Sequence, residues 1–106
     1  MDYSEREYIS KVINYFWGNN TSTPNNINDK ATIVTYKALE QANICSKSMD
    51  LVPRPKYGVI DIKYAIKQLV NIGKRIAQGD TAIYNTCRSM VSARYKFEIK
   101  MALQGI

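Results

Sequence analysis

The hydrophobic periodicity of residues 59–78 restricts the fold of this chain more than any other feature of the sequence. At about 100° per residue, the apolar side chains of this stretch fall on one continuous arc of roughly 160°. They are Val59, Ile62, Ala65, Ile66, Leu69, Val70, Ile72, Ile76 and Ala77. This pattern predicts a long amphipathic α-helix over 59–78 with one buried face and with Gly79 as its C-terminal cap.

Two helices are predicted before this stretch. Ser4 and Glu7 have the spacing of a capping box and predict a helix over 5–17 that ends at Gly18. A second apolar stripe predicts a helix over 30–46, after a loop rich in Asn, Ser, Thr and Pro. Residues 31–36, with the sequence ATIVTY, are rich in β-branched side chains, so a short strand there is the alternative.

A last helix is predicted over 81–103, with Asp80 as its N-cap. The joint between helices 59–78 and 81–103 is so short that the two helices are expected to form an antiparallel hairpin. The predicted fold class is therefore all-α. We expect one helical domain over 1–106, built as a small four-helix bundle with that hairpin at its centre.

Several classes of chemistry find no support in the sequence. There is no histidine, which is the commonest general base and the commonest metal ligand. The sequence NIGKR contains Gly-Lys, but Gln68 and Arg75 stand where a P-loop needs glycine and a hydroxyl side chain. Cys45 and Cys87 lie far apart at apolar helical positions, which predicts buried free thiols. We therefore expect no enzyme activity, no cofactor and no metal.

The sequence also bears on location. No apolar run approaches the roughly 18–20 residues needed to cross a bilayer. The first ten residues, MDYSEREYIS, are charged and unlike a secretory signal. A cytoplasmic protein without membrane contact is the expectation.

Charge is unevenly distributed along the chain. Residues 1–50 contain five Lys/Arg and six Asp/Glu, a net charge of −1, whereas residues 51–106 contain ten Lys/Arg and three Asp/Glu, a net charge of +7. This asymmetry indicates that part of the surface faces an anionic partner.

The polar side of helix 59–78 is the predicted contact surface. It contains the candidate partner-binding residues Lys63, Tyr64, Lys67, Asn71, Lys74 and Arg75. Its three lysines lie within about 40° of one another around the helix axis. A row of lysines with amides and a tyrosine between them suits an anion, but it is also typical of a solvated helix face, and both interpretations stay open.

The apolar face of helix 81–103 raises a second question. Arg94 and Glu98 fall within that face, four residues apart, and can form an ion pair. The pair is interpreted either as structural or as part of a polar site. The apolar arc is also wider than one neighbouring helix can cover, so this helix could form a homodimer interface.

Three functions are consistent with these features. The first is a small non-enzymatic regulatory or inhibitory protein, of the phage or mobile-element accessory type, that occupies a macromolecular partner through the basic helical face. The alternatives are a nucleic-acid-binding accessory protein that contacts phosphates through Lys63, Lys67 and Lys74, and an immunity-type protein that neutralises a toxin. The expected partner is an acidic protein surface or nucleic acid.

Overall fold

The computed structural model describes residues 1–18, 27–42, 44, 61–91 and 94–104, and these residues form an all-α fold. Its elements are α1 (Tyr3–Trp17), α2 (Asp29–Gln41), α3 (Ile62–Ala77), α4 (Ala82–Asn85), the 3-10 helix η3 (Arg88–Met90) and α5 (Arg94–Leu103). The all-α prediction is confirmed, and the helices together form a compact globule.

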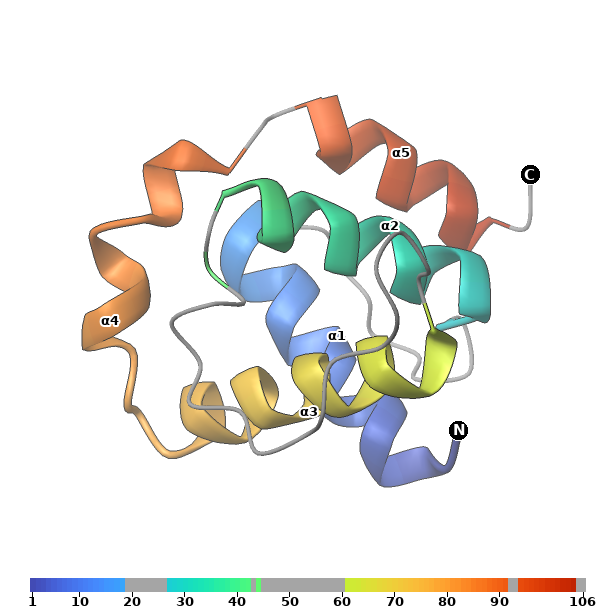
Figure 1. The fold of residues 1–106 in the computed structure, drawn as a ribbon, viewed down its shortest axis with the longest axis horizontal. Helices are drawn as coiled ribbons and strands as arrows, with labels where there is room; N and C mark the ends of the chain where they lie inside the picture. The colour runs from blue at the N-terminus through green and yellow to red at the C-terminus, as the bar shows by residue number, and fades with distance from the viewer. Residues whose placement is uncertain (19–26, 43, 45–60, 92–93, 105–106) are drawn as a thin grey trace.

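Two packing relationships organise the fold. α1 packs along α3, while α2 packs against both α3 and α5. Figure 1 shows α3 and α5 on opposite sides of α2, with α4 and η3 between the end of α3 and the start of α5. α2 therefore separates α3 from α5.

The first helix begins earlier than the sequence pattern suggested. Asp2, and not Ser4, is its N-cap: the Asp2 carboxylate accepts a hydrogen bond of 2.8 Å from the backbone N–H of Glu5. The Glu5 carboxylate in turn accepts one of 2.9 Å from the N–H of Asp2. This reciprocal pair is a capping box. The helix ends at Gly18, as predicted, in the left-handed conformation with φ 68°.

Residues 31–36 are helical, so the predicted helix is confirmed and the alternative strand is not formed. Asn28 caps α2 by accepting from the N–H of Ala31 at 2.8 Å. Thr32 and Thr35 are fully buried, and their hydroxyls donate to the carbonyl oxygens of Asn28 and Ala31. Because these bonds satisfy the hydroxyls within the helix, two β-branched polar residues are accommodated in its interior. The helix ends at Gln41, before the predicted residue 46.

The predicted hairpin of helices 59–78 and 81–103 is not confirmed. α3 ends in a Schellman motif: Gly79 has φ 79° and donates to the carbonyl of Ile76, while Asp80 donates to that of Arg75. Beyond it, the predicted long helix is interrupted into α4, η3 and α5. The side chains of TAIYNTCRSM explain the interruption, since Thr, Asn and Ser compete with helical hydrogen bonds. Asp80 does not cap a helix either, because Thr81 takes the N-cap position of α4.

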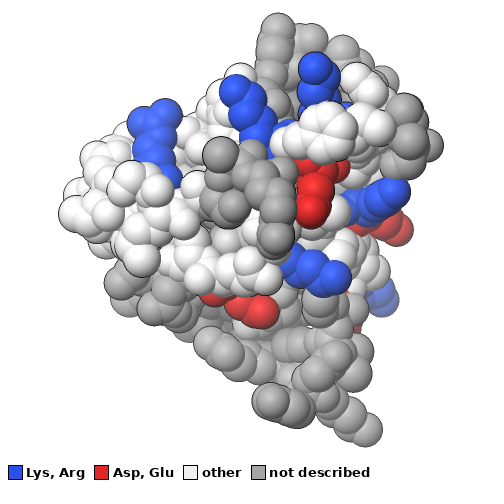
Figure 2. Space-filling view, turned by 90° about the horizontal axis from the view of Figure 1, so that it is seen from above, with Lys and Arg blue, Asp and Glu red and all other residues white. Residues whose placement is uncertain are grey.

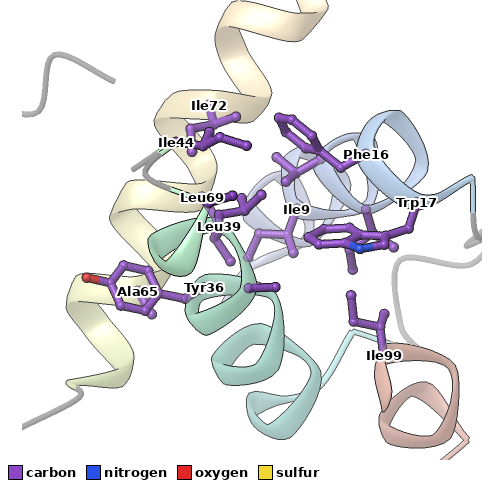
Figure 3. Packing of buried hydrophobic residues seen from close by; sticks show 14 of the residues in the cluster. Ile9, Phe16, Trp17, Tyr36, Leu39, Ile44, Ala65, Leu69, Ile72 and Ile99 are labelled. Atoms are coloured by element: carbon purple, nitrogen blue, oxygen red, sulfur yellow. The ribbon is translucent and has the colours of Figure 1, made fainter. Parts of the chain in front are cut away.

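A single buried cluster joins α1, α2, α3 and α5. Figure 3 shows Leu39 of α2 beside Leu69 of α3, and Ile99 of α5 pointing toward Trp17 of α1. Ile99 is fully buried and Trp17 almost so. The indole of Trp17 thus forms part of the surface on which α5 docks.

Candidate functional site

The lysine row of α3, defined as Lys63, Lys67 and Lys74, is the part of the predicted contact surface that the structure leaves exposed. All three side chains lie opposite the buried face of the helix. At 1.5 Å per residue, the row extends about 16 Å along the helix axis. The exposed face predicted for these three residues is confirmed.

The lysines differ in their surroundings. Neither Lys63 nor Lys67 forms an ion pair with any residue that the structure describes. The Nζ atom of Lys74 lies 5.9 Å from the centre of the Tyr8 ring, at the outer limit for a cation–π contact. At the N-terminal end, Asp61 caps the helix by accepting from the backbone N–H of Lys63 at 2.8 Å. The row thus presents positive charge with little local compensation.

Val70 divides the lysine row. By helical periodicity it projects near the lysines, yet only 9% of its surface is exposed. The interval between Lys67 and Lys74 is therefore not an open polar strip. A partner would contact two lysines on one side of this apolar point and one on the other.

Tyr64 does not belong to the exposed surface, in contrast to the prediction. It is 8% exposed, and its ring packs edge-on against Tyr36 of α2 with centroids 5.9 Å apart. The neighbouring polar position Gln68 is also buried. The reason is that α3 packs against two helices and not one, so its buried face extends beyond the apolar arc and includes this flank.

The remaining two candidates on α3 are partly enclosed. Asn71 is half-buried. Arg75 is half-buried as well, and its Nη1 atom lies 3.5 Å from Oδ2 of Asp80 beyond the helix end. Since both side chains lie partly within the protein, the accessible basic surface of α3 consists of the lysine row.

The face of α5 also differs from the prediction. Glu98 is exposed, while Tyr95, Ile99 and Ala102 form the buried side of the helix. Glu98 therefore does not lie on a buried stripe, and the side chain of Arg94 falls outside the described part of the chain. The rotation follows from helical spacing, since a face centred on Ile99 turns position 98 about 100° away.

One cluster was not anticipated from the sequence. The hydroxyl of Tyr15 hydrogen-bonds to the side-chain oxygen of Asn85, and the guanidinium of Arg88 lies 4.5 Å from the centre of the Tyr15 ring. Phe16 packs edge-on against Tyr15 and Tyr84, with centroids 4.8 and 5.9 Å away. These contacts hold α4 and η3 against α1. No local pattern could reveal them, because the partners are about 70 positions apart.

Cys87 is a free, buried thiol, as predicted, whereas Cys45 lies outside the described residues. No group of three metal-ligating side chains is found in the part of the chain that the structure describes. None of its described helices combines the length and the apolar character that a membrane crossing requires.

Comparison with known proteins finds no matching family model, and no curated protein or solved structure matches the chain significantly.

Proposed function

We propose that this chain is a small non-enzymatic binding protein that occupies an acidic surface of a macromolecular partner through the lysine row of α3. The observation that carries the proposal is the alignment of Lys63, Lys67 and Lys74 on one exposed helix face, where Lys63 and Lys67 form no ion pair with the described residues. A solvated helix face commonly mixes charges of both signs, which gain stability as i, i+4 pairs. Here the only carboxylate of α3 and its caps near the row is Asp61, which is used to cap the helix.

The row suits fast and selective association more than high affinity. Exposed lysines retain their hydration and flexibility, so each contributes little to the binding free energy. Several of them on one face nevertheless steer an acidic partner toward the protein and disfavour basic partners. This behaviour fits a regulator or inhibitor that must find one macromolecular surface quickly.

Nucleic acid is the second candidate partner, because an ammonium group binds phosphate as readily as carboxylate. The two partners differ in their response to salt. A duplex held by three lysines would lose affinity with a log–log slope of about −2.7 against salt concentration. An acidic protein surface held partly by apolar contacts would depend on salt less steeply. An immunity-type role would be one case of the acidic-protein interpretation.

The test is a charge-reversal variant, Lys63→Glu/Lys67→Glu/Lys74→Glu, compared with the parent. Fluorescein-labelled oligoglutamate and a labelled 20-base-pair duplex serve as probes, titrated at several salt concentrations. The matched control is Lys11→Glu/Lys30→Glu/Lys37→Glu, which changes the net charge equally on α1 and α2. We expect the first variant to lose binding and the control to retain most of it.

The outcome that contradicts the proposal is equal binding by the first variant and its control. Any loss of binding in the two variants would then reflect the change in net charge alone. Binding of the duplex with the predicted slope, and none of oligoglutamate, would assign the row to nucleic acid. Once one probe class is established, partners that co-purify with the parent and the control but not with the first variant identify the natural target.

A further inference from the structure

The cluster of Tyr15, Asn85 and Arg88 presents hydrogen-bond donors to solvent. The guanidinium of Arg88 lies over the Tyr15 ring, and the residue is exposed. No hydrogen bond or ion pair joins the Arg88 side chain to another residue that the structure describes. A cation–π contact uses none of the five N–H groups of a guanidinium, so they stay available to an acceptor. Asn85 is exposed as well, and its amide nitrogen takes no part in the bond from Tyr15.

Both supports of this cluster rest on the hydrophobic core. The Tyr15 ring lies edge-on to Phe16, with centroids 4.8 Å apart. Tyr84, which precedes Asn85, is fully buried and packs against the same Phe16 ring at 5.9 Å. The Tyr15 ring and the start of the turn that bears Asn85 are therefore held in place. A guanidinium that already lies on such a ring loses less conformational freedom when it binds an acceptor.

No carboxylate that the structure describes neutralises Arg88. Asp80 is the acid nearest to it along the chain, and it lies 3.5 Å from Nη1 of Arg75. The acid of α1 nearest to Tyr15 in sequence is Glu7, which points about 80° away around the helix axis. The face where α5 lies is different, because Figure 2 shows Lys and Arg interspersed there with Asp and Glu.

The cluster continues the basic surface beyond the end of the lysine row. Lys74 is the last residue of the row, and its Nζ atom lies 5.9 Å from the centre of the Tyr8 ring. Tyr8 and Tyr15 project within about 20° of each other and lie about 10 Å apart along α1. One flank of α1 thus leads from Lys74 to Arg88, and a partner that extends past the row along this flank reaches the cluster.

We propose that Arg88 and Asn85 bind a side-chain carboxylate of the same acidic protein that the lysine row attracts. This inference rests on the proposed function, in which the row steers the partner but contributes little affinity. The guanidinium N–H groups form a planar fork that matches the two oxygens of a carboxylate, and the Asn85 amide can donate to one of them.

The composition of the cluster favours a protein carboxylate over a phosphate. The single positive charge of Arg88 balances one carboxylate, and no second Lys or Arg of the described residues contacts the Tyr15 ring to balance a more highly charged phosphate. Arginine and tyrosine are also the residue types that supply most of the binding energy at protein–protein interfaces, where lysine is depleted. The cluster is therefore the anchor of the contact.

The first test uses the full chain and fluorescein-labelled oligoglutamate, followed by fluorescence anisotropy. Arg88→Lys keeps the charge but lacks the planar fork, so it should weaken binding about 3- to 10-fold. Asn85→Asp places a carboxylate beside Arg88 and should weaken binding at least as much. Ser89→Ala is the matched control, since Ser89 is an exposed neighbour on η3, and it should bind within about twofold of the parent.

The second test observes the fork directly and does not depend on the lysine row. The Nε–Hε resonance of Arg88, assigned by its loss in Arg88→Lys, is followed by NMR in the lysine-row variant Lys63→Glu/Lys67→Glu/Lys74→Glu. Sodium acetate should shift this resonance, and Asn85→Asp should reduce the shift. Inorganic phosphate at equal ionic strength should shift it less than acetate does.

Two results would overturn the anchor without touching the proposed function. They are equal oligoglutamate binding by the parent and Arg88→Lys while the lysine-row variant loses binding, and an Arg88 resonance that acetate leaves unchanged. A larger shift with phosphate than with acetate would also overturn it, because the fork would then be a phosphate site. If the lysine-row variant binds oligoglutamate as well as its charge-matched control does, but Arg88→Lys binds it less well and acetate shifts the resonance, the role of the row is wrong and the carboxylate site at Arg88 is supported.

Discussion

Gly73 of α3 lies directly against the backbone of Tyr8 in α1. A Cβ atom placed on Gly73 would lie 2.5 Å from the carbonyl oxygen and 2.7 Å from the Cβ of Tyr8. Real Cβ atoms do not approach other heavy atoms this closely, so only glycine allows the two helices their present separation. The contact fixes how α3 is rotated about its axis, and hence the direction in which the lysine row projects.

We predict that Gly73→Ala destabilises the protein by about 2 kcal/mol. Overpacking costs about 1–3 kcal/mol, and the upper end applies because two of the obstructing atoms belong to the backbone of Tyr8 and cannot rotate away. The better helix propensity of alanine offsets about 1 kcal/mol of this cost. Urea denaturation of parent and variant measures the difference.

The control for Gly73→Ala compares Lys67→Ala with Lys67→Gly at an exposed position of the same helix. At position 67 the alanine variant should be more stable than the glycine variant by about 1 kcal/mol, because the two differ only in helix propensity. If alanine is favoured to the same extent at position 73, the close contact between α1 and α3 is absent in solution.

Tyr15 and Arg88 are predicted to be energetically coupled. The guanidinium of Arg88 over the Tyr15 ring should contribute about 0.5–1 kcal/mol at this exposed site. A double-mutant cycle with Tyr15→Leu and Arg88→Ala, read by urea denaturation, isolates that term. Asn85→Ala serves as a second cycle with Tyr15→Phe, which removes only the hydroxyl. Strict additivity in both cycles would show that α4 and η3 are not held to α1 by these groups.

The Asp2 cap makes a predictable contribution to the pH dependence of stability. Hydrogen bonds from the Glu5 N–H and then from the Ser4 hydroxyl lower the pKa of the Asp2 carboxyl below its ordinary value of 3.8. Because the folded-state pKa is depressed, the ionised cap stabilises the protein at pH values above 3.8, and this stabilisation is lost as the pH falls through the folded-state pKa.

Asp2→Asn tests this linkage, since asparagine caps a helix without titrating. The difference in melting temperature between parent and variant should shrink on acidification from pH 7 to pH 3. A difference that stays constant over this range would show that the Asp2 carboxylate is not the titrating cap.

Much of the fold follows from local pattern, as α3 shows. Its apolar arc and Gly79 predicted the helix and its end correctly, because burial of a stripe and the left-handed C-cap are local requirements. The rotation of the helix was not predictable in the same way. Tyr64 is buried because α2 packs on that flank, and periodicity within one helix does not tell how many neighbours it has. Gly73 was the available signal, since a glycine inside a helical pattern commonly marks a close approach.

The exposure of the lysine row was also predictable from local pattern. Lys63, Lys67 and Lys74 could be assigned to an exposed face because no helix buries three unpaired lysines. The buried face of α5 could not be predicted in this way. The predicted helix 81–103 assumed that one helical phase continues without a break through Thr81, Asn85, Thr86 and Ser89. When the helix breaks there, the phase of the later segment is reset, and Phe97 turns outward while Ile99 turns inward.

The final prediction concerns the docking of α5. Ile99 is fully buried and points toward Trp17, the single tryptophan of the chain. Ile99→Ala should cost about 2–5 kcal/mol, because it removes the central apolar contact of a ten-residue helix and leaves a cavity. Loss of this contact should also admit water to the indole, so the emission of Trp17 should shift to longer wavelength. The neighbouring Glu98→Ala should change stability by less than about 1 kcal/mol and leave the emission unchanged, because Glu98 is exposed. If Ile99→Ala unfolds more easily but keeps the parent's emission, α5 stays docked through Tyr95 and Ala102.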